Sequence, residues 1–163
     1  MSDTRRVRLG FHSENLPMTR LTAVASSLFL AGLLGCSTVP APPEVLVLGH
    51  DYTFQLPDSL PAGRTAFAFE NAGQVPHEMI LVGLRDGATL QEVATRRREG
   101  RDWQELVEST AAILIAPPGE RSAAQVLADL EAGRTYALVC NFQDSDSAPP
   151  HTELGMMKSL HVY

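Results

Sequence analysis

Four side chains in this chain are of types that bind soft metal ions. Cys140 ends a strand-like segment, His151 follows after ten residues, and Met156 follows after four more. His77 begins a separate strand-like segment earlier in the chain. Two imidazoles and a thiolate in one plane, with a distant thioether on the axis, are the ligand set of a type 1 copper site. Because sulfur suits Cu(I) and imidazole suits both oxidation states, this donor set predicts copper and one-electron exchange.

Taken singly, each of these side chains has an ordinary structural explanation. Cys140 could be a small buried apolar residue, His77 a hydrogen-bonded histidine at the end of a strand, and Met156 a filler of the core. The metal-site interpretation is favoured because all four residues occur together, in an order that one site can use. Met157 is the alternative axial ligand, and the spacing from His151 favours Met156.

The segments around these residues resemble those of plastocyanin and its relatives, the cupredoxins. Residues 69–77 (FENAGQVPH) are similar to the turn that delivers the first histidine ligand in that family. Residues 133–140 (GRTYALVC) resemble the strand that presents the cysteine, and residues 151–162 (HTELGMMKSLHV) resemble the C-terminal ending of plastocyanin. The resemblance implies a cupredoxin domain that binds one type 1 copper ion through His77, Cys140, His151 and Met156.

Three features depart from the plastocyanin and azurin pattern. The ten residues between Cys140 and His151 make a longer loop than in small cupredoxins, nearer to that of copper nitrite reductases. Glu78 stands where those proteins carry asparagine, and Asn141 stands where they place a small hydroxyl residue. We predict that Glu78 and Asn141 form a hydrogen bond across the site, and that Asn71 also belongs to the surroundings of the ligands.

Short strands are predicted to position these ligands, because short strand-like segments bounded by turn signals dominate the chain after residue 44. Two segments with helical composition, Leu90–Arg98 and Trp103–Ala112, interrupt this pattern and predict a helical insertion over residues 88–112. The fold class expected is all-β, a Greek-key β-sandwich of the cupredoxin type with a short helical insertion. Strands are predicted at Val45–Leu48, Tyr52–Gln55, Thr65–Asn71, His77–Leu84, Ala124–Leu130, Thr135–Cys140 and Ser159–Tyr163.

The first part of the chain is predicted to be an export signal. Residues 21–35 (LTAVASSLFLAGLLG) are uncharged and mostly apolar. A helix of that length rises about 22 Å, less than the roughly 30 Å hydrocarbon core of a bilayer, so it is typical of a signal peptide. Met18 and Arg20 complete such a signal by themselves, which indicates a misassigned start before Met18. We predict a signal peptide over residues 1–35.

The residues that follow this signal predict a lipid anchor. Leu33 to Cys36 (LLGC) resembles the lipobox of bacterial lipoproteins, which implies that Cys36 is lipidated and becomes the mature N-terminus. The alternative is an ordinary cleaved signal peptide with an incidental cysteine. Residues 36–44 are rich in proline and predict a tether, followed by the cupredoxin domain at 45–163. The expected location is the bacterial cell envelope, on a periplasm-facing lipoprotein bound to the membrane at Cys36.

Charge and motifs exclude several classes of function. The net charge is −6, and the one basic cluster, Arg96–Arg98, lies among acidic residues, so a nucleic-acid partner is not expected. Coupled multicopper enzymes commonly have a histidine directly beside the cysteine ligand, and no histidine adjoins Cys140. Cys36 is the only other cysteine. No haem-attachment motif or nucleophile elbow occurs either. We therefore expect an electron carrier or copper-binding protein, not an enzyme, and no small-molecule substrate.

The leading functional hypothesis is one-electron transfer by a type 1 copper site. The alternatives are a module that stores Cu(I) or hands it over, and a metal-free cupredoxin-like interaction domain. Electron transfer requires a redox partner protein, which we expect to dock at an exposed edge of His151. Three acidic residues near His151 in the sequence, Asp144, Asp146 and Glu153, favour a partner of basic charge.

Overall fold

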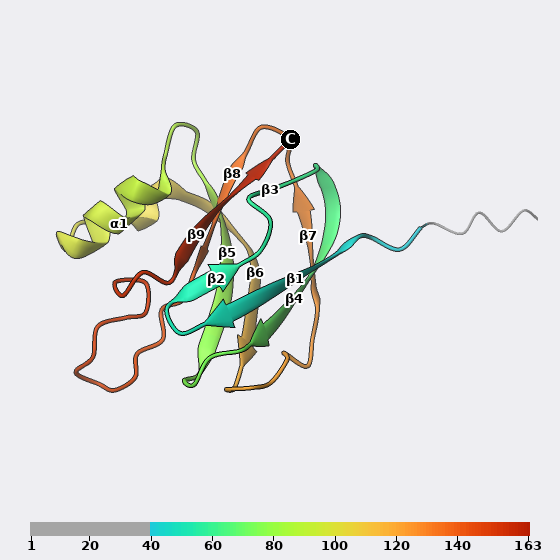
Figure 1. Cartoon of the computed structure of the whole chain (residues 1–163). Helices are drawn as coiled ribbons and strands as arrows, with labels where there is room; N and C mark the ends of the chain where they lie inside the picture. Colours follow the sequence, from blue (N-terminus) through green and yellow to red (C-terminus); the bar gives the residue numbers. More distant parts are fainter. Residues whose placement is uncertain (1–39) are drawn as a thin grey trace, which may run out of the picture. The chain divides into compact units, whose positions relative to one another are not determined.

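The computed structural model describes residues 40–163, in which the strands form two sheets (Figure 1). The predicted signal segment and Cys36 lie outside the described residues. The order of strands is β2-β1-β4-β7 in the first sheet and β3-β9-β8-β5-β6 in the second. The strands are β1 (Glu44–His50), β2 (Thr53–Gln55), β3 (Ser59–Leu60), β4 (Gly63–Asn71), β5 (His77–Leu84), β6 (Val107–Ala116), β7 (Val126–Leu130), β8 (Thr135–Val139) and β9 (Met157–Val162).

The two sheets enclose the core, to which both contribute side chains that are fully buried. Phe67 and Phe69 come from β4, while Met79, Leu81 and Leu138 come from β5 and β8. The pairs β1–β4 and β3–β9 are parallel, and the remaining pairs are antiparallel. The chain changes sheet after β2, β3, β4, β6 and β7. These features confirm the predicted all-β Greek-key sandwich.

The insertion contains one α-helix, α1 (Leu90–Arg98), which matches the first predicted helical segment. Thr89 caps it by accepting a hydrogen bond from the Glu92 N–H at 3.1 Å, and three arginines in the last turn suit the negative end of the helix dipole. The helical insertion is therefore confirmed, but it is shorter than predicted.

No helix within residues 40–163 is long and apolar enough to cross a membrane.

The second predicted helical segment, Trp103–Ala112, is wrong. After a 3₁₀ turn at Gln104–Leu106 the chain runs as β6, which pairs antiparallel with β5. In its second half Ala112, Leu114 and Ala116 are buried, while the isoleucines between them, at 113 and 115, are exposed. This period of two is that of a strand, and the pairing with β5 outweighs the helical propensity of the alanines.

The gap between β7 and β8 is a corner between the two sheets. The sequence left a hairpin or a tight corner open for Glu131–Arg134, and β7 and β8 belong to different sheets. Gly133 adopts a φ of 80°, which glycine reaches at little cost, and its N–H donates to the Val162 carbonyl at 2.8 Å. The corner thus sends β8 into the second sheet, where it carries Cys140 toward the site.

Candidate metal centre

Three strand ends bring the predicted ligands together at one end of the second sheet. His77 is the first residue of β5, Cys140 directly follows β8, and Met156 directly precedes β9. Because β8 runs antiparallel to both β5 and β9, its end lies beside their beginnings. His151 reaches the same place through the loop that joins β8 to β9, and its N–H donates to the Phe142 carbonyl at 2.8 Å, which closes that loop at its base.

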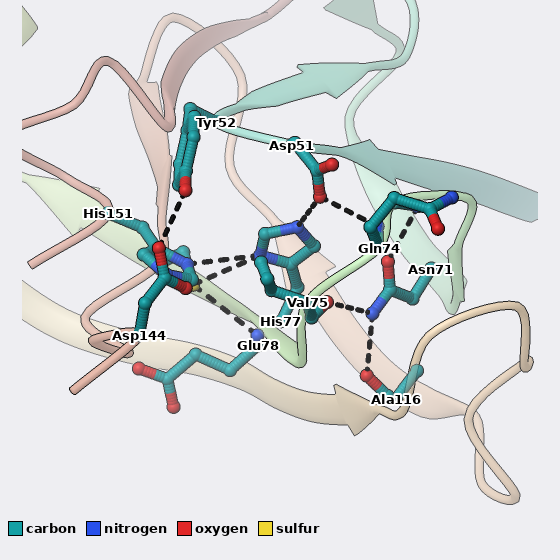
Figure 2. Close-up of polar contacts among 12 residues, drawn as sticks. Asp51, Tyr52, Asn71, Gln74, Val75, His77, Glu78, Ala116, Asp144 and His151 are labelled. Atoms are coloured by element: carbon teal, nitrogen blue, oxygen red, sulfur yellow. Dashed lines mark hydrogen bonds and ion pairs between the residues drawn. The ribbon is translucent and has the colours of Figure 1, made fainter.

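The donor atoms of His77, Cys140 and His151 face one another in a buried cluster. The two Nδ1 atoms are 3.1 Å apart, and the Cys140 Sγ lies 3.4 Å from the Nδ1 of His151 and 4.0 Å from the Nδ1 of His77. Figure 2 shows the two imidazoles with these nitrogen atoms turned toward each other. None of the three residues exposes more than 1% of its surface.

These separations fit one metal ion bound to all three atoms. For metal–nitrogen bonds of about 2.0 Å and metal–sulfur bonds of about 2.3 Å, donors in one plane lie roughly 3 to 4 Å apart. Two imidazoles and a thiolate at such distances, with a methionine beside them, form a site of the type 1 copper kind. The residues present therefore fit copper, and His77, Cys140 and His151 are the ones that would hold it in the plane.

Met156 belongs to this cluster by its position and burial. It is fully buried, its N–H donates to the His151 carbonyl at 2.9 Å, and its carbonyl accepts from the Cys140 N–H at 3.3 Å. Met157, the alternative axial ligand, is half-buried and lines a surface pocket next to α1. The structure thus places Met156 inside and Met157 outside, which favours Met156 as the axial ligand.

The outer nitrogen of each histidine is bonded to a carboxylate. The Nε2 of His77 lies 3.2 Å from the Oδ1 of Asp51, and the Nε2 of His151 lies 2.9 Å from the Oδ1 of Asp144 (Figure 2). Each bond places the Nε2 proton toward the carboxylate, so the Nδ1 atom is free to bind a metal. The structure contradicts the expectation of an exposed edge of His151, because Asp144 and Tyr52 cover that edge and leave the residue 1% exposed.

The turn between β1 and β2 supplies two of the residues that cover the histidines. Asp51 binds His77, and Tyr52 donates its hydroxyl to the Oδ2 of Asp144 at 2.6 Å. The Tyr52 ring also packs edge-on against His151, with ring centroids 5.1 Å apart. Tyr52 has a φ of 65°, a conformation that is uncommon for a residue with a side chain. This turn was not assigned to the site from the sequence.

Gly73 is required by the contact between Asp51 and His77. A Cβ at this position would collide with the Oδ1 of Asp51 and would lie 2.9 Å from the Nε2 of His77, shorter than van der Waals contact. A residue with a side chain would therefore push the carboxylate and the imidazole away from each other.

Asn71 holds the segment that leads to His77. Its side-chain amide donates to the carbonyls of Val75 at 2.8 Å and Ala116 at 3.0 Å, and its Oδ1 accepts from the Gly73 N–H at 2.9 Å. The side chain is fully buried. Asn71 thus fixes the loop before β5 and touches no ligand atom.

Glu78 and Asn141 are joined by a hydrogen bond, as the sequence predicted, with a backbone group as the donor. The Asn141 N–H donates to the Oε1 of Glu78 at 2.9 Å. The side chain of Asn141 accepts instead from the hydroxyl of Thr152 at 3.1 Å. The Glu78 N–H points at the Cys140 sulfur, 3.5 Å away. Glu78 therefore connects the start of β5 to the Cys140 thiol and to the residue that follows it.

We expect Glu78→Ala to destabilise the metal-free protein by about 1 to 3 kcal/mol, because it leaves the Asn141 N–H without its acceptor. Urea denaturation followed by circular dichroism measures the change. Glu78→Gln is the matched control, since its amide oxygen can still accept the bond, and it should restore most of the lost stability. Equal losses in both variants would show that the carboxylate charge, and not this hydrogen bond, is what matters.

Burial favours the uncharged forms of Cys140 and His77 before a metal binds. It raises the pKa of the Cys140 thiol, and it lowers the pKa of His77 against the opposing effect of Asp51. The pKa values of Asp51 and Asp144 are lowered by the hydrogen bonds these carboxylates accept, mainly from the Gln74 N–H and the Tyr52 hydroxyl. A neutral His77 imidazole thus faces the ionised Asp51 carboxylate, and metal binding releases the Cys140 thiol proton.

No protein-family model and no curated protein matches the chain. Among solved structures, a reduced auracyanin from the photosynthetic bacterium Roseiflexus castenholzii is 17% identical, with a TM-score of 0.49, and the match covers 76% of this chain and 99% of that one. Auracyanin A, a "blue" copper protein from Chloroflexus aurantiacus, is 21% identical with a TM-score of 0.48 over 76% and 100% of the two chains. A reduced rusticyanin is 17% identical with a TM-score of 0.46 over 76% and 82%.

Proposed function

We propose that this protein is an exported one-electron carrier with a single type 1 copper ion. The observation that carries the proposal is the convergence of the Nδ1 atoms of His77 and His151 with the Sγ of Cys140, within 3.1 to 4.0 Å of one another in a buried cluster. Copper in such a site exchanges one electron between Cu(II) and Cu(I). The absence of nucleophile motifs in the sequence supports a carrier over an enzyme.

The sandwich holds the ligands so that little moves when an electron is exchanged. His77 is fixed by β5 and by its bond to Asp51, and His151 is fixed by its backbone bond to Phe142 and by its bond to Asp144. Cys140 accepts the Glu78 N–H on its sulfur. The same contacts would hold the donor atoms in both oxidation states of the ion, which favours rapid exchange because little rearrangement has to accompany it.

Burial of the ligands favours electron transfer over Cu(I) storage or handover. Passing the ion to another protein requires a ligand that the recipient can approach, and all four ligands are at most 1% exposed. An electron can cross the thin cover formed by Tyr52 and Asp144, whereas the ion cannot cross it without opening the loop. Opening would break the bond between Asp144 and His151.

The location and the partner are part of the same proposal. The apolar segment at residues 21–35 and the LLGC sequence ending at Cys36 support export and lipid anchoring at the bacterial envelope, on the periplasmic side. The partner is a redox protein of basic charge, because Asp51 and Asp144 lie directly over the histidines and Asp146 and Glu153 are exposed nearby. Such charges would steer a basic surface toward the site.

The test is the visible spectrum of the purified full-length protein during titration with Cu(II). An intense blue band that saturates at one copper per chain is the expected result, because only a thiolate bound to Cu(II) in a type 1 site produces it. A colourless protein that binds Cu(I) tightly would support handover instead. A protein that takes up no copper would leave only the metal-free interaction module.

A further inference from the structure

Both histidine ligands donate their outer N–H to a carboxylate. The Asp51 Oδ1 lies 3.2 Å from the Nε2 of His77, and the Asp144 Oδ1 lies 2.9 Å from the Nε2 of His151. A carboxylate in this position makes the imidazole a stronger donor to the metal. The arrangement is symmetrical about the site, since each imidazole lies between the donor cluster and one carboxylate (Figure 2).

The charges of these two carboxylates are not neutralised nearby. Within residues 40–163, the only ion pairs that Asp51 and Asp144 form are those with His77 and His151. Their side chains are about one-third exposed, so water screens them only in part. Two negative charges on the outer side of the ligands stabilise Cu(II) more than Cu(I), because the oxidised site carries one more positive charge.

Tyr52 weakens the effect of one of the two carboxylates, Asp144, on its histidine. Its hydroxyl donates to the Oδ2 of Asp144 at 2.6 Å, while His151 donates to the Oδ1 of the same group. A short hydrogen bond from a neutral donor draws negative charge away from the oxygen that faces His151. The tyrosine hydroxyl therefore reduces the influence of the Asp144 charge on the metal, although the same hydrogen bond helps to hold the loop in place.

We propose that Asp51 and Asp144 lower the reduction potential of the site by strengthening His77 and His151 as donors, and that Tyr52 limits the effect of Asp144. This inference rests on the proposed type 1 copper site. Asp51, Asp144 and Tyr52 are positioning residues that act through the histidines. They set how strongly the protein holds its electron, and so which redox partners can reduce or oxidise it.

Opposite shifts separate this role from a merely structural one. Asp144→Asn keeps an oxygen that can accept the His151 N–H but removes the charge, so the potential rises. Tyr52→Phe removes the competing donor, so Asp144 acts on His151 more strongly and the potential falls. If these residues only kept the loop in order, both variants would loosen it and both would shift the potential in the same direction.

The experiment is a redox titration of the copper-loaded full-length protein, monitored by its blue band at about 0.1 M ionic strength, where exposed charges more than about 10 Å from the site are largely screened. Asp144→Asn and Asp51→Asn should each lower the ratio of Cu(II) affinity to Cu(I) affinity about tenfold, as expected for the loss of such a partner, which raises the potential by about 59 mV. Tyr52→Phe should raise that ratio.

Asp146→Asn is the matched control, because it removes one exposed carboxylate from the same loop without touching a histidine. It should change the ratio of affinities less than twofold. Separate measurements of the Cu(II) and Cu(I) affinities should place the loss in Asp144→Asn on the Cu(II) side.

The outcomes distinguish this inference from the proposed function. A wild-type protein that binds copper with a blue band, but whose Asp144→Asn and Tyr52→Phe variants shift together or match Asp146→Asn, overturns the inference and leaves the function standing. A wild-type protein without copper or without the blue band overturns both. Opposite shifts of Asp144→Asn and Tyr52→Phe, with a rise in Asp51→Asn, support it.

Discussion

Replacing Cys140 with serine is expected to remove the blue absorption of the copper-loaded protein completely. The band arises from charge transfer between a thiolate and Cu(II), and Cys140 is the only thiol among residues 40–163. Its sulfur lies 3.4 Å from the Nδ1 of His151, close enough for both to bind one ion. A serine hydroxyl is a harder donor that stays protonated, so it replaces neither the bond nor its colour. Visible spectra at one equivalent of Cu(II) measure the loss.

Two methionine variants serve as controls for this prediction. Met156→Leu removes the axial thioether and should keep the blue band while raising the reduction potential, because the axial ligand tunes that potential. Met157→Leu should change neither, since Met157 lies beside α1. Retention of the band in Cys140→Ser would assign the colour to another site. A change of the reduction potential in Met157→Leu but not in Met156→Leu would show that Met157, and not Met156, is the axial ligand.

The ligands could be predicted from the sequence because each lies in a short local pattern. Pro76-His77 and the spacing from His151 to Met156 are local, and order along the chain joins them into one set. Asp51 and Tyr52 lack such a signal: Asp51 meets His77 across 26 positions of the chain, and Tyr52 meets Asp144 across 92. Only the pairing of the strands shows that the turn between β1 and β2 covers the histidines.

The difference between local patterns and long-range contacts also explains why β6 was predicted as a helix. β4, which places Phe67 and Phe69 on one face, and β5, a near-continuous apolar run, were predicted within a few residues of their observed ends. β6 was missed because its buried positions include alanines, whose small side chains suit a helix equally well, and because its strand character depends on pairing with β5. Local composition cannot show which neighbour a segment will pair with.

Covering the histidines changes what a redox partner would meet. Tyr52 and Asp144 lie over His151, so a partner contacts a phenol ring and a carboxylate instead of a bare imidazole edge. The Tyr52 ring packs edge-on against that imidazole and, in the proposed carrier, would offer a short route for the electron. The acidic cover supports the basic partner proposed above, and it leaves the donor atoms buried.

Phe69→Ala is expected to destabilise the metal-free protein by about 3 to 5 kcal/mol, the usual cost of removing a buried phenylalanine. Phe69 is fully buried on β4, and its ring lies 6.3 Å from that of Phe54, centroid to centroid. The ring also packs against the backbone of Gly49 on β1, so its loss leaves a cavity between two paired strands. Urea denaturation measures the change. Ile115→Ala is the control, because Ile115 is 53% exposed and should cost less than about 0.5 kcal/mol.

Gly49 tests whether this packing is specific. A Cβ on Gly49 would lie 2.8 Å from the Phe69 Cε2 and Cζ atoms, so Gly49→Ala should cost about 1 to 3 kcal/mol in the wild-type background through overpacking. In the Phe69→Ala background the same methyl group enters the cavity and should cost much less. The double variant should therefore be more stable than the sum of the single changes predicts, by about 1 kcal/mol or more. Strict additivity would show that the Phe69 ring does not press on β1, and that its fully buried position does not depend on the glycine at position 49.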